Sequence, residues 1–420
     1  MIEKESSIAC IDMKAFYASV ECVERGLDPL TTPLVVTDTT RSESTIVLSV
    51  SHYLKSKGVP SRCRKKDIPS NIEGIIYAIP QMDKYIQISA FINSIMLDYV
   101  GIDDLHIYSI DECFLDLTPY LRLNKCDDIT LVKRILKDIY LQTGLIATCG
   151  IGPNMFLAKV ACDKEAKKNK DYIAKWTRDD IKTKLWPIKP LNELWGISRG
   201  YLERLNAHGI YSVKDLATFP KEILIEELGV LGEELHNHAN GIDETKIRDK
   251  YVPTSKGFSL GQVLMKDYSY KSGKLILSEM VQDLSFRLRS SGFKTSKVSL
   301  GVRYSASSSS LGFIKEISLI SPSDSNKVLE EALLHLYNAY IDKDQLIRAI
   351  YIAYSALLKP SFDQLELFKS YEDKVAEDAL NNSFDEIWKR YGKDKLLKLD
   401  ALTKDSTIKL RHSQIGGHKK

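Results

Sequence analysis

Two adjacent carboxylates stand inside the stretch Tyr108-Ser109-Ile110-Asp111-Glu112-Cys113-Phe114-Leu115-Asp116. The pair Asp111-Glu112 falls at a turn between two apolar, strand-like runs. Far upstream, the apolar run Ile8-Ala9-Cys10-Ile11-Asp12-Met13 also ends on a carboxylate. Because neighbouring strand ends can bring these three acids together, the sequence predicts a carboxylate cluster at one edge of a sheet.

Such a cluster repels itself unless cations fill it, and hard oxygen ligands favour Mg²⁺. Two such ions can clamp the attacking and leaving oxygens of a phosphoryl displacement. Taken alone, an Asp-Glu pair in a chain with 56 acidic residues is more often a solvated turn. The apolar flanks, and a specific helix start after Asp12, favour the metal site. We interpret the nearby Asp116 as a solvated or structural acid.

That helix start is Lys14-Ala15-Phe16-Tyr17-Ala18-Ser19-Val20-Glu21. Here the chain resembles the Y-family DNA polymerases, the translesion enzymes of UmuC and DinB type. Their first motif is an apolar strand, an Asp and two aromatic residues shortly after it, and another motif is the Ser-Ile/Val-Asp-Glu turn. Both motifs stand intact, and the resemblance covers nearly the whole chain. It is closest to UmuC-like polymerases of Gram-positive bacteria and their mobile elements.

Composition sets further bounds. A chain of 420 residues holds about three domains on the usual length prior. The net charge is only +3, so DNA binding must rest on local clusters. Seven scattered cysteines without a CxxC pair suggest reduced, mostly packed thiols and a cytoplasmic protein. The early charges at Glu3-Lys4-Glu5 argue against a signal peptide, and no apolar run approaches the roughly 20 residues of a membrane span.

The resemblance implies an α+β fold, a right-hand polymerase with five parts. These are a ferredoxin-like palm (1–16 and 82–185), small fingers (17–81), a helical helix-hairpin-helix thumb (186–245), a linker (246–257) and a β-α-β-β-α-β little finger (258–360). A charged tail with helical patches follows (361–420), and beyond Pro360 the chain is expected to leave the folded core. Periodicity predicts palm strands at Ile8–Met13, Ile107–Ile110 and Ile146–Gly150, and helices at Asp83–Val100 and Asp128–Leu141.

In the thumb, His208-Gly209-Ile210 leads into a capping-box helix start at Ser212-Val213-Lys214-Asp215. Backbone N–H groups at such a start suit a DNA phosphate, although an ordinary corner between two helices has the same pattern. The little finger reads as a split βαβ unit. Its predicted elements are Phe258–Leu264, a helix from Ser272 to Ser291, Val298–Tyr304, Phe313–Ile320, a helix from Asp324 to Ala339, and Ile347–Leu357. Ser305–Ser310 is expected to be a hairpin loop.

The resemblance also implies the chemistry, which is attack of a primer 3′-OH on the α-phosphate of a bound dNTP. Asp12 and Asp111 would bridge two Mg²⁺ ions, and Glu112 would complete the site nearer the primer end. The Met13 carbonyl would be a backbone ligand. Such catalysis is mostly positioning and electrostatics.

For the nucleotide, Lys159 matches the family's helix bearing a phosphate lysine. The family's Tyr-x-x-Arg motif is changed here. Alignment on Gly58 puts His52 at the Tyr position and Lys55 at the Arg position, whereas a one-residue shift would nominate Tyr53. A solvated lysine and a capping histidine are the plain alternatives. Lys offers a point charge in place of a bidentate fork, so it grips phosphate less firmly.

Phe16 and Tyr17 occupy the aromatic pair of the first motif, with Tyr17 at the steric gate that would exclude a ribose 2′-OH. Buried helix aromatics are more often simple core residues. The basic runs 62–66 and 164–170 can meet DNA phosphates or form a solvated face. Five little-finger cations are better placed for DNA by the resemblance: Arg287, Arg289, Lys294, Lys297 and Arg303.

The peptide Gln364-Leu365-Glu366-Leu367-Phe368 resembles the segment by which bacterial polymerases bind the β sliding clamp. Gln364, Leu367 and Phe368 would make the contact, unless a tail helix packs these residues on the core. The expected partners are primer-template DNA, dNTP, this clamp and an accessory UmuD-like or recombinase subunit, and no membrane association is expected.

The favoured function is template-directed, error-prone synthesis across damaged DNA. Two other functions stay open: another palm-type nucleotidyl transferase, such as a cyclic-dinucleotide synthase, and a catalytically inactive relative acting as a scaffold. The thumb hairpin and the β-α-β-β-α-β region argue against the first. The presence of all three acids argues against the second.

Overall fold

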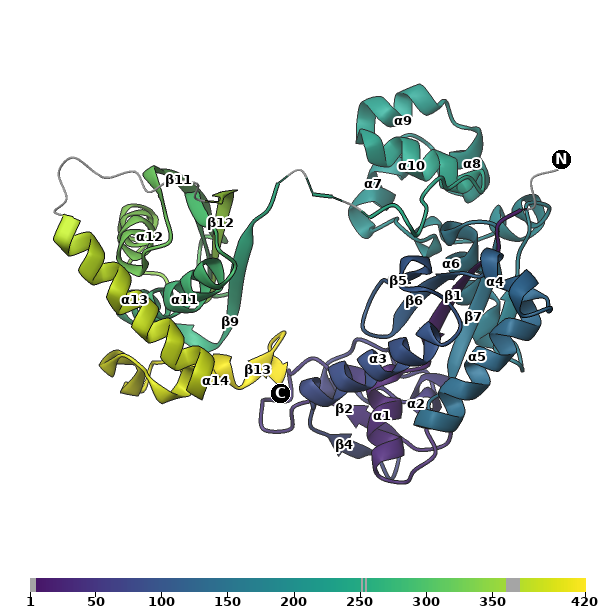
Figure 1. Ribbon diagram of the computed structural model, residues 1–420, viewed down its shortest axis with the longest axis horizontal. Coiled ribbons are helices and arrows are strands. Elements are labelled where there is room, and N and C mark those ends of the chain that lie inside the picture. The colour runs from purple at the N-terminus through teal and green to yellow at the C-terminus, as the bar shows by residue number, and fades with distance from the viewer. Residues whose placement is uncertain (1–4, 251, 254, 360–370) are drawn as a thin grey trace. The chain divides into compact units, whose positions relative to one another are not determined.

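The protein is described here from a computed structural model that covers residues 5–250, 252–253, 255–359 and 371–420 (Figure 1). The chain divides at residues 250 and 251 into two compact units. None of the helices in these described ranges is both long and apolar enough to cross a membrane. Each unit is considered by itself.

The N-terminal unit is built on a five-stranded sheet in the order β5-β6-β1-β7-β8. Its strands are β1 (Ile8–Met13), β5 (Leu105–Ile107), β6 (Glu112–Asp116), β7 (Ala147–Gly152) and β8 (Ile173–Lys175). The central strand β1 runs antiparallel to both β6 and β7. The predicted strand Ile8–Met13 is confirmed. The predicted strand Ile107–Ile110 is wrong after Ile107, because the next residues form the turn into β6.

Helices pack against this sheet: α3 (Met82–Leu97), α4 (Thr118–Leu123), α5 (Asp128–Thr143) and α6 (Met155–Lys164). Asn154 caps α6 by accepting from the backbone N–H of Leu157 at 2.8 Å. A Cβ atom at Gly150 would lie 2.1 Å from the carbonyl oxygen of Ala158, so glycine allows α6 to approach β7 closely. Cys10 shares a buried cluster with α6, which places that helix on the face toward which Asp12 also projects.

A smaller sheet in the order β3-β2-β4 lies within residues 17–81. Its elements are α1 (Phe16–Glu24), β2 (Leu34–Val36), β3 (Ser49–Val50), α2 (His52–Ser56) and β4 (Ile76–Ala78). Seven buried apolar residues between Val35 and Ile68 form its own core. This small core agrees with the small fingers that the resemblance implies.

Four short helices follow: α7 (Arg199–Ala207), α8 (Val213–Thr218), α9 (Lys221–Leu228) and α10 (Val230–Ala239). The predicted capping box is confirmed, since Ser212 and Asp215 bond reciprocally to each other's backbone N–H groups. Gly209, in the hairpin before it, adopts a φ of 76°, a left-handed conformation that glycine tolerates best. The core of these helices is continuous with α6.

The predicted polar linker 246–257 begins as part of the N-terminal unit. Ile247 is 9% exposed and joins the cluster under β1 and α6. Arg248 makes two hydrogen bonds to Asp104, at 2.6 and 2.9 Å. Ile247 stands among polar residues and gives no periodic apolar pattern. The sequence therefore did not predict that this segment packs on the N-terminal unit.

The C-terminal unit contains a sheet in the order β11-β10-β12-β9 with two helices. The elements are β9 (Phe258–Tyr268), α11 (Tyr270–Ser290), β10 (Lys294–Tyr304), β11 (Gly312–Ser323), α12 (Asn326–Tyr340) and β12 (Ile347–Leu358). The predicted element order is confirmed, and so is the turn between β10 and β11. One apolar cluster joins both helices to one face of the sheet.

The tail corrects an expectation, because residues 371–418 belong to the same compact unit. They contain α13 (Tyr371–Tyr391), α14 (Ile408–His412), β13 (Gln414–Ile415) and the start of β14 (His418–Lys419). Trp388 is 3% exposed and packs on Phe286 of α11 with ring centroids 5.3 Å apart. The candidate clamp residues Gln364, Leu367 and Phe368 lie outside the described residues.

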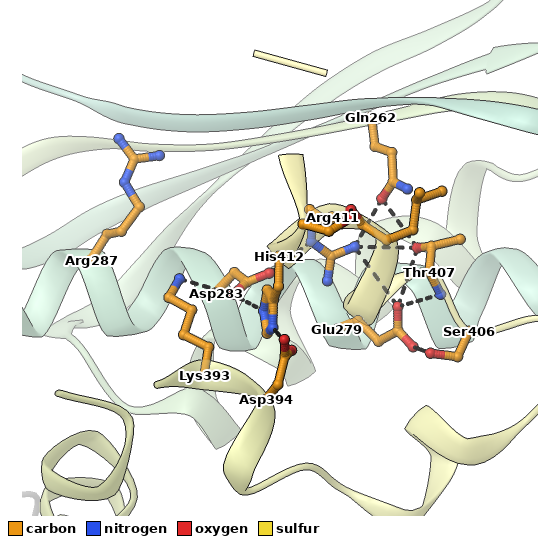
Figure 2. Close-up of polar contacts among 12 residues, drawn as sticks. Gln262, Glu279, Asp283, Arg287, Lys393, Asp394, Ser406, Thr407, Arg411 and His412 are labelled. Carbon is orange, nitrogen blue, oxygen red and sulfur yellow. Dashed lines mark hydrogen bonds and ion pairs between the residues drawn. The ribbon is translucent and has the colours of Figure 1, made fainter. Parts of the chain in front are cut away.

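Two buried acids explain this docking (Figure 2). Glu279 and Asp283 lie one turn apart on α11 and are 5% and 4% exposed. Arg411 donates to Asp283 at 2.7 Å, and the backbone N–H of Thr407 donates to Glu279 at 3.1 Å. Buried carboxylates need such partners, and here the tail supplies them. Sequence reading had no way to pair residues more than a hundred positions apart.

Candidate active site

The sheet register brings the sequence-predicted acids together at one end of β1. Asp12 pairs with Glu112 across the β1–β6 ladder. The backbone N–H of Met13 donates to the carbonyl oxygen of Asp111 at 2.9 Å. Asp12, Met13, Asp111 and Glu112 therefore lie on adjacent strand ends, as the two motifs predicted.

Each carboxylate has a different partner. Lys167 donates to Asp12 Oδ2 at 3.0 Å, and Ser109 Oγ donates to Asp111 Oδ1 at 2.7 Å. Lys159 Nζ lies 2.7 Å from Glu112 Oε1. Burial raises the pKa of Asp12 to about 6, against the opposing effect of the lysine charges. A buried carboxylate with a raised pKa gains from a nearby cation.

The predicted metal cage is not preformed. Among the residues that the structure describes, no three His, Cys, Asp or Glu side chains gather closely enough to hold a metal ion. Ammonium groups of Lys159 and Lys167 face two of the acids instead. The donor set still fits a hard divalent cation, since it consists of three carboxylates and a backbone carbonyl on adjacent strands.

Lys159 lies in a position that its motif did not anticipate. Its side chain and that of Glu112 are each 8% exposed, and Asp163 Oδ2 is 3.2 Å from the same ammonium. Burial by itself lowers the pKa of Lys159, but the neighbouring Cys10, Asp163 and Glu112 raise it overall. Cys10 Sγ also donates to Glu112 at 3.1 Å. This lysine is thus held inside the protein against Glu112.

Lys167 is the lysine that faces Asp12, and sequence reading counted it only as part of a basic run. It also donates to Asp163 Oδ1 at 2.7 Å. The i, i+4 spacing of Asp163 and Lys167 was the available signal. That spacing alone could not tell which lysine of the run points toward the acids.

The predicted steric gate lies beside the acids. Phe16 is 2% exposed and belongs to the core, while Tyr17 is only partly buried. Burial and the charge of Asp111 both raise the pKa of Tyr17. Its ring lies 4.8 Å from that of Tyr85, whose hydroxyl donates to Glu21 at 2.5 Å. Tyr17 therefore packs against Tyr85 and feels the charge of Asp111.

Helix α2 carries the residues of both alignments. Tyr53 packs on the fingers core. Burial lowers the pKa of Lys55, and the charges of Asp12 and Asp111 oppose that effect. Burial, Lys14 and Lys55 lower the pKa of His52. These surroundings agree with the alignment that uses His52 and Lys55, which stays a prediction.

Several basic candidates for DNA contact are engaged within the protein. Arg289 is a correction, because its side chain is 10% exposed and makes bonds of 2.7 and 2.8 Å to Asp385 of α13. It was misjudged because the tail that covers it was expected to leave the core. Lys65 and Lys297 pair with Glu43 and Glu316, at 2.5 and 3.0 Å. Both pairs are partly exposed.

Comparisons with known proteins agree on one family. Residues 11–163 match the impB/mucB/samB family, and residues 255–367 match the C-terminal domain of that family. A relative described as the UV-damage repair protein UvrX, from Bacillus subtilis (strain 168), is 34% identical over 98% of this chain and 97% of its own. DNA polymerase IV 2 of the same strain is 31% identical over 99% of this chain and 100% of its own.

A solved structure of a Y-family DNA polymerase chimera of Dbh and Dpo4 has a TM-score of 0.67 at 19% identity. It covers 84% of this chain and 100% of the chimera. At that identity the likeness shows the fold alone. The fold it shows is the right-hand polymerase architecture.

Proposed function

Because this chain belongs to the impB/mucB/samB family and is a Y-family translesion DNA polymerase, we propose that its nucleotidyl transfer takes place at the acids of β1 and the β6 turn. Asp12 and Asp111 would hold the divalent metal ions, with the Met13 carbonyl as a further ligand. Glu112 would complete the metal site at the end nearer the primer 3′-OH. The adjacency of these groups across the β1–β6 ladder is the observation that supports the proposal most strongly.

Divalent metal use is general in this family, and we propose two Mg²⁺ ions here. When bound, they would supply charge neutralisation at the reacting phosphate and acidify the primer 3′-OH. The chain's own residues supply orientation. Ser109 holds the carboxylate of Asp111, and the Met13 N–H ties the turn to β1, so the strand ends keep a fixed separation. Such preorganisation avoids reorganisation during the reaction.

For the incoming nucleotide we propose Lys167 and Lys55 as the principal triphosphate contacts, with His52 beside them. Lys167 faces Asp12, and the charges of Asp12 and Asp111 act on Lys55. Lys159 would act one step back. Because it is enclosed with Glu112, it holds that carboxylate in place through their ion pair. This differs from the phosphate-binding role that its motif implies.

We propose that Tyr17 excludes ribonucleotides by meeting a 2′-OH with its ring. The support is its position between the buried Phe16 and the charge of Asp111. The contact with Tyr85 restricts movement of the Tyr17 ring. A ring held on both sides gives a steric check without any hydrogen bond to the sugar.

The remaining assignments extend the same proposal to partners. The five parts named from the sequence keep their boundaries in this proposal, and Ile247 anchors the start of the linker. Primer-template DNA would contact the thumb hairpin and the little-finger sheet. Gln364, Leu367 and Phe368 would bind the β sliding clamp, which raises the effective concentration of the enzyme at the primer end. An accessory UmuD-like or recombinase subunit and a cytoplasmic location complete the proposal.

Primer extension on a defined template with Mg²⁺, offering one dNTP at a time, tests the function. We expect addition of the nucleotide that the template directs. Products formed from two nucleoside triphosphates without a primer would favour a cyclic-dinucleotide synthase. DNA binding without any extension would favour an inactive scaffold.

A further inference from the structure

Lys14 is a residue near the acids to which neither the motifs nor the proposed mechanism assigns a role. It follows Asp12 by two positions, and its backbone N–H donates to the carbonyl oxygen of Ile146 at 2.9 Å. Its ammonium lies 4.4 Å from the centroid of the Tyr172 ring. That distance is within the range of a cation–π contact. The backbone hydrogen bond fixes the main chain of Lys14, and the contact with the Tyr172 ring fixes the direction of its side chain.

Tyr172 adopts an unusual conformation that fixes this ring. Its φ is 59°, in the left-handed region that side chains other than glycine rarely adopt. Its carbonyl oxygen accepts from the backbone N–H of Cys149 at 2.8 Å, at the edge of β7 and β8. Strained residues persist where the surrounding structure fixes them, and they gather at functional sites. Here the strained residue supports Lys14.

The ring that holds Lys14 belongs to the same loop as Lys167. The backbone N–H of Tyr172 donates to the carbonyl oxygen of Asn169 at 3.3 Å, and Asn169 follows Lys167 by two positions. Lys167 already donates to Asp12. Within the part of the chain that the structure describes, Lys14 itself makes no ion pair. An ammonium without a carboxylate partner, close to a second lysine, favours an anionic ligand.

We propose that Lys14 is a further triphosphate-binding residue of the polymerase, positioned by the ring of Tyr172. The inference rests on the proposed active site and adds a third cation to Lys55 and Lys167. Lys14 would contact a phosphate oxygen beyond the reacting α-phosphate, because it lies past the end of β1 on the side of the other lysines. The ligand class is the pyrophosphate portion of a nucleoside triphosphate.

The competing explanation is that Lys14 only balances the charge of Asp12. The two explanations differ in what pyrophosphate does. If Lys14 holds the pyrophosphate portion, its loss weakens both substrate binding and product inhibition by pyrophosphate. If it only balances Asp12, its loss changes turnover and metal dependence but leaves pyrophosphate inhibition unchanged.

The test compares Lys14→Met with wild type in primer extension, measuring KM for dNTP, kcat, inhibition by added pyrophosphate and DNA affinity. Methionine keeps the unbranched stem and removes the charge. Lys182→Met is the matched control, since the Lys182 ammonium also lies over an aromatic ring, 5.9 Å from the centroid of Trp186. Lys167→Met is the positive control. Tyr172→Phe and Tyr172→Ala, alone and with Lys14→Met, test the support by the ring.

We expect Lys14→Met to raise KM for dNTP and the pyrophosphate inhibition constant together by roughly tenfold, the effect of one lost charge-assisted contact. DNA affinity and Lys182→Met should match wild type. Tyr172→Phe should also match wild type, while Tyr172→Ala should raise KM and add nothing to Lys14→Met.

Unchanged pyrophosphate inhibition in Lys14→Met would overturn the proposal, and so would additive effects of Tyr172→Ala. If Lys14→Met does not fold, Tyr172→Ala alone carries the test, and an unchanged KM for that variant overturns it. Failure of the underlying active site would look different, because Lys167→Met would then leave KM unchanged as well.

Discussion

Replacing Lys159 by methionine separates two roles for this residue. The pair of Lys159 and Glu112 is enclosed, with both side chains 8% exposed and their charged atoms 2.7 Å apart. Asp163, the other neighbour of Lys159, keeps a second partner because Lys167 donates to it at 2.7 Å. The group left without a cation in Lys159→Met is therefore Glu112.

Removing one partner of a buried ion pair costs roughly 3–5 kcal/mol, mostly because the other charge stays buried and uncompensated. We expect Lys159→Met to lower the free energy of unfolding by about that amount. Neutralising Glu112 as well removes the unpaired charge. The double variant Lys159→Met with Glu112→Gln should therefore be more stable than Lys159→Met alone.

The assay is urea unfolding of wild type, both single variants and the double variant, followed through the transition of the N-terminal unit. Primer extension on the same proteins gives kcat and KM for dNTP. We expect Lys159→Met to lower kcat more than it raises KM, because Glu112 loses the ammonium that holds it in place. Unchanged stability together with a raised KM would refute this reasoning and restore Lys159 as a phosphate contact.

Three further predictions concern the nucleotide and the clamp. Tyr17→Ala should raise the ratio of rNTP to dNTP incorporation, and a ratio equal to that of wild type would leave Tyr17 as an ordinary packing residue. His52→Ala and Lys55→Ala should each raise KM for dNTP without weakening DNA binding, as measured by titration of labelled primer-template. Leu367→Ala combined with Phe368→Ala should abolish stimulation by the sliding clamp but spare extension without it. Loss of both activities together would assign these two residues to the folded core.

Much of the site could be predicted because it depends on local patterns. An apolar strand ending in Asp12 and a turn bearing Asp111 and Glu112 are each readable within about ten residues. The two motifs come together because their strands are neighbours in the sheet. In the β1–β6 register, Asp12 lies opposite Glu112 for the same reason.

The choice among lysines could not be predicted, because it depends on the direction of side chains in three dimensions. Lys159 lies within α6 and Lys167 lies beyond its end, so the first is directed inward at Glu112 and the second outward at Asp12. A motif match ranked Lys159 above Lys167. Only the packing of α6 against β1 distinguishes the two.

The tail was missed for a related reason. Arg289, Glu279 and Asp283 read as a charged helix face, which is usually solvated. Their partners come from residues 385–412, far along the chain. A charged segment that supplies counter-charges to a distant helix has the same composition as a solvated tail, so composition could not separate the two possibilities.

The most direct test of the active site is primer extension by Asp111→Ala, with DNA affinity measured on the same preparation. Loss of the shared metal ligand should remove several kcal/mol of transition-state stabilisation, so extension should fall by at least about a thousandfold. DNA affinity and the unfolding midpoint should stay close to those of wild type, since Asp111 is partly exposed at a turn. Extension within about tenfold of wild type would contradict the assignment of these acids as the catalytic centre.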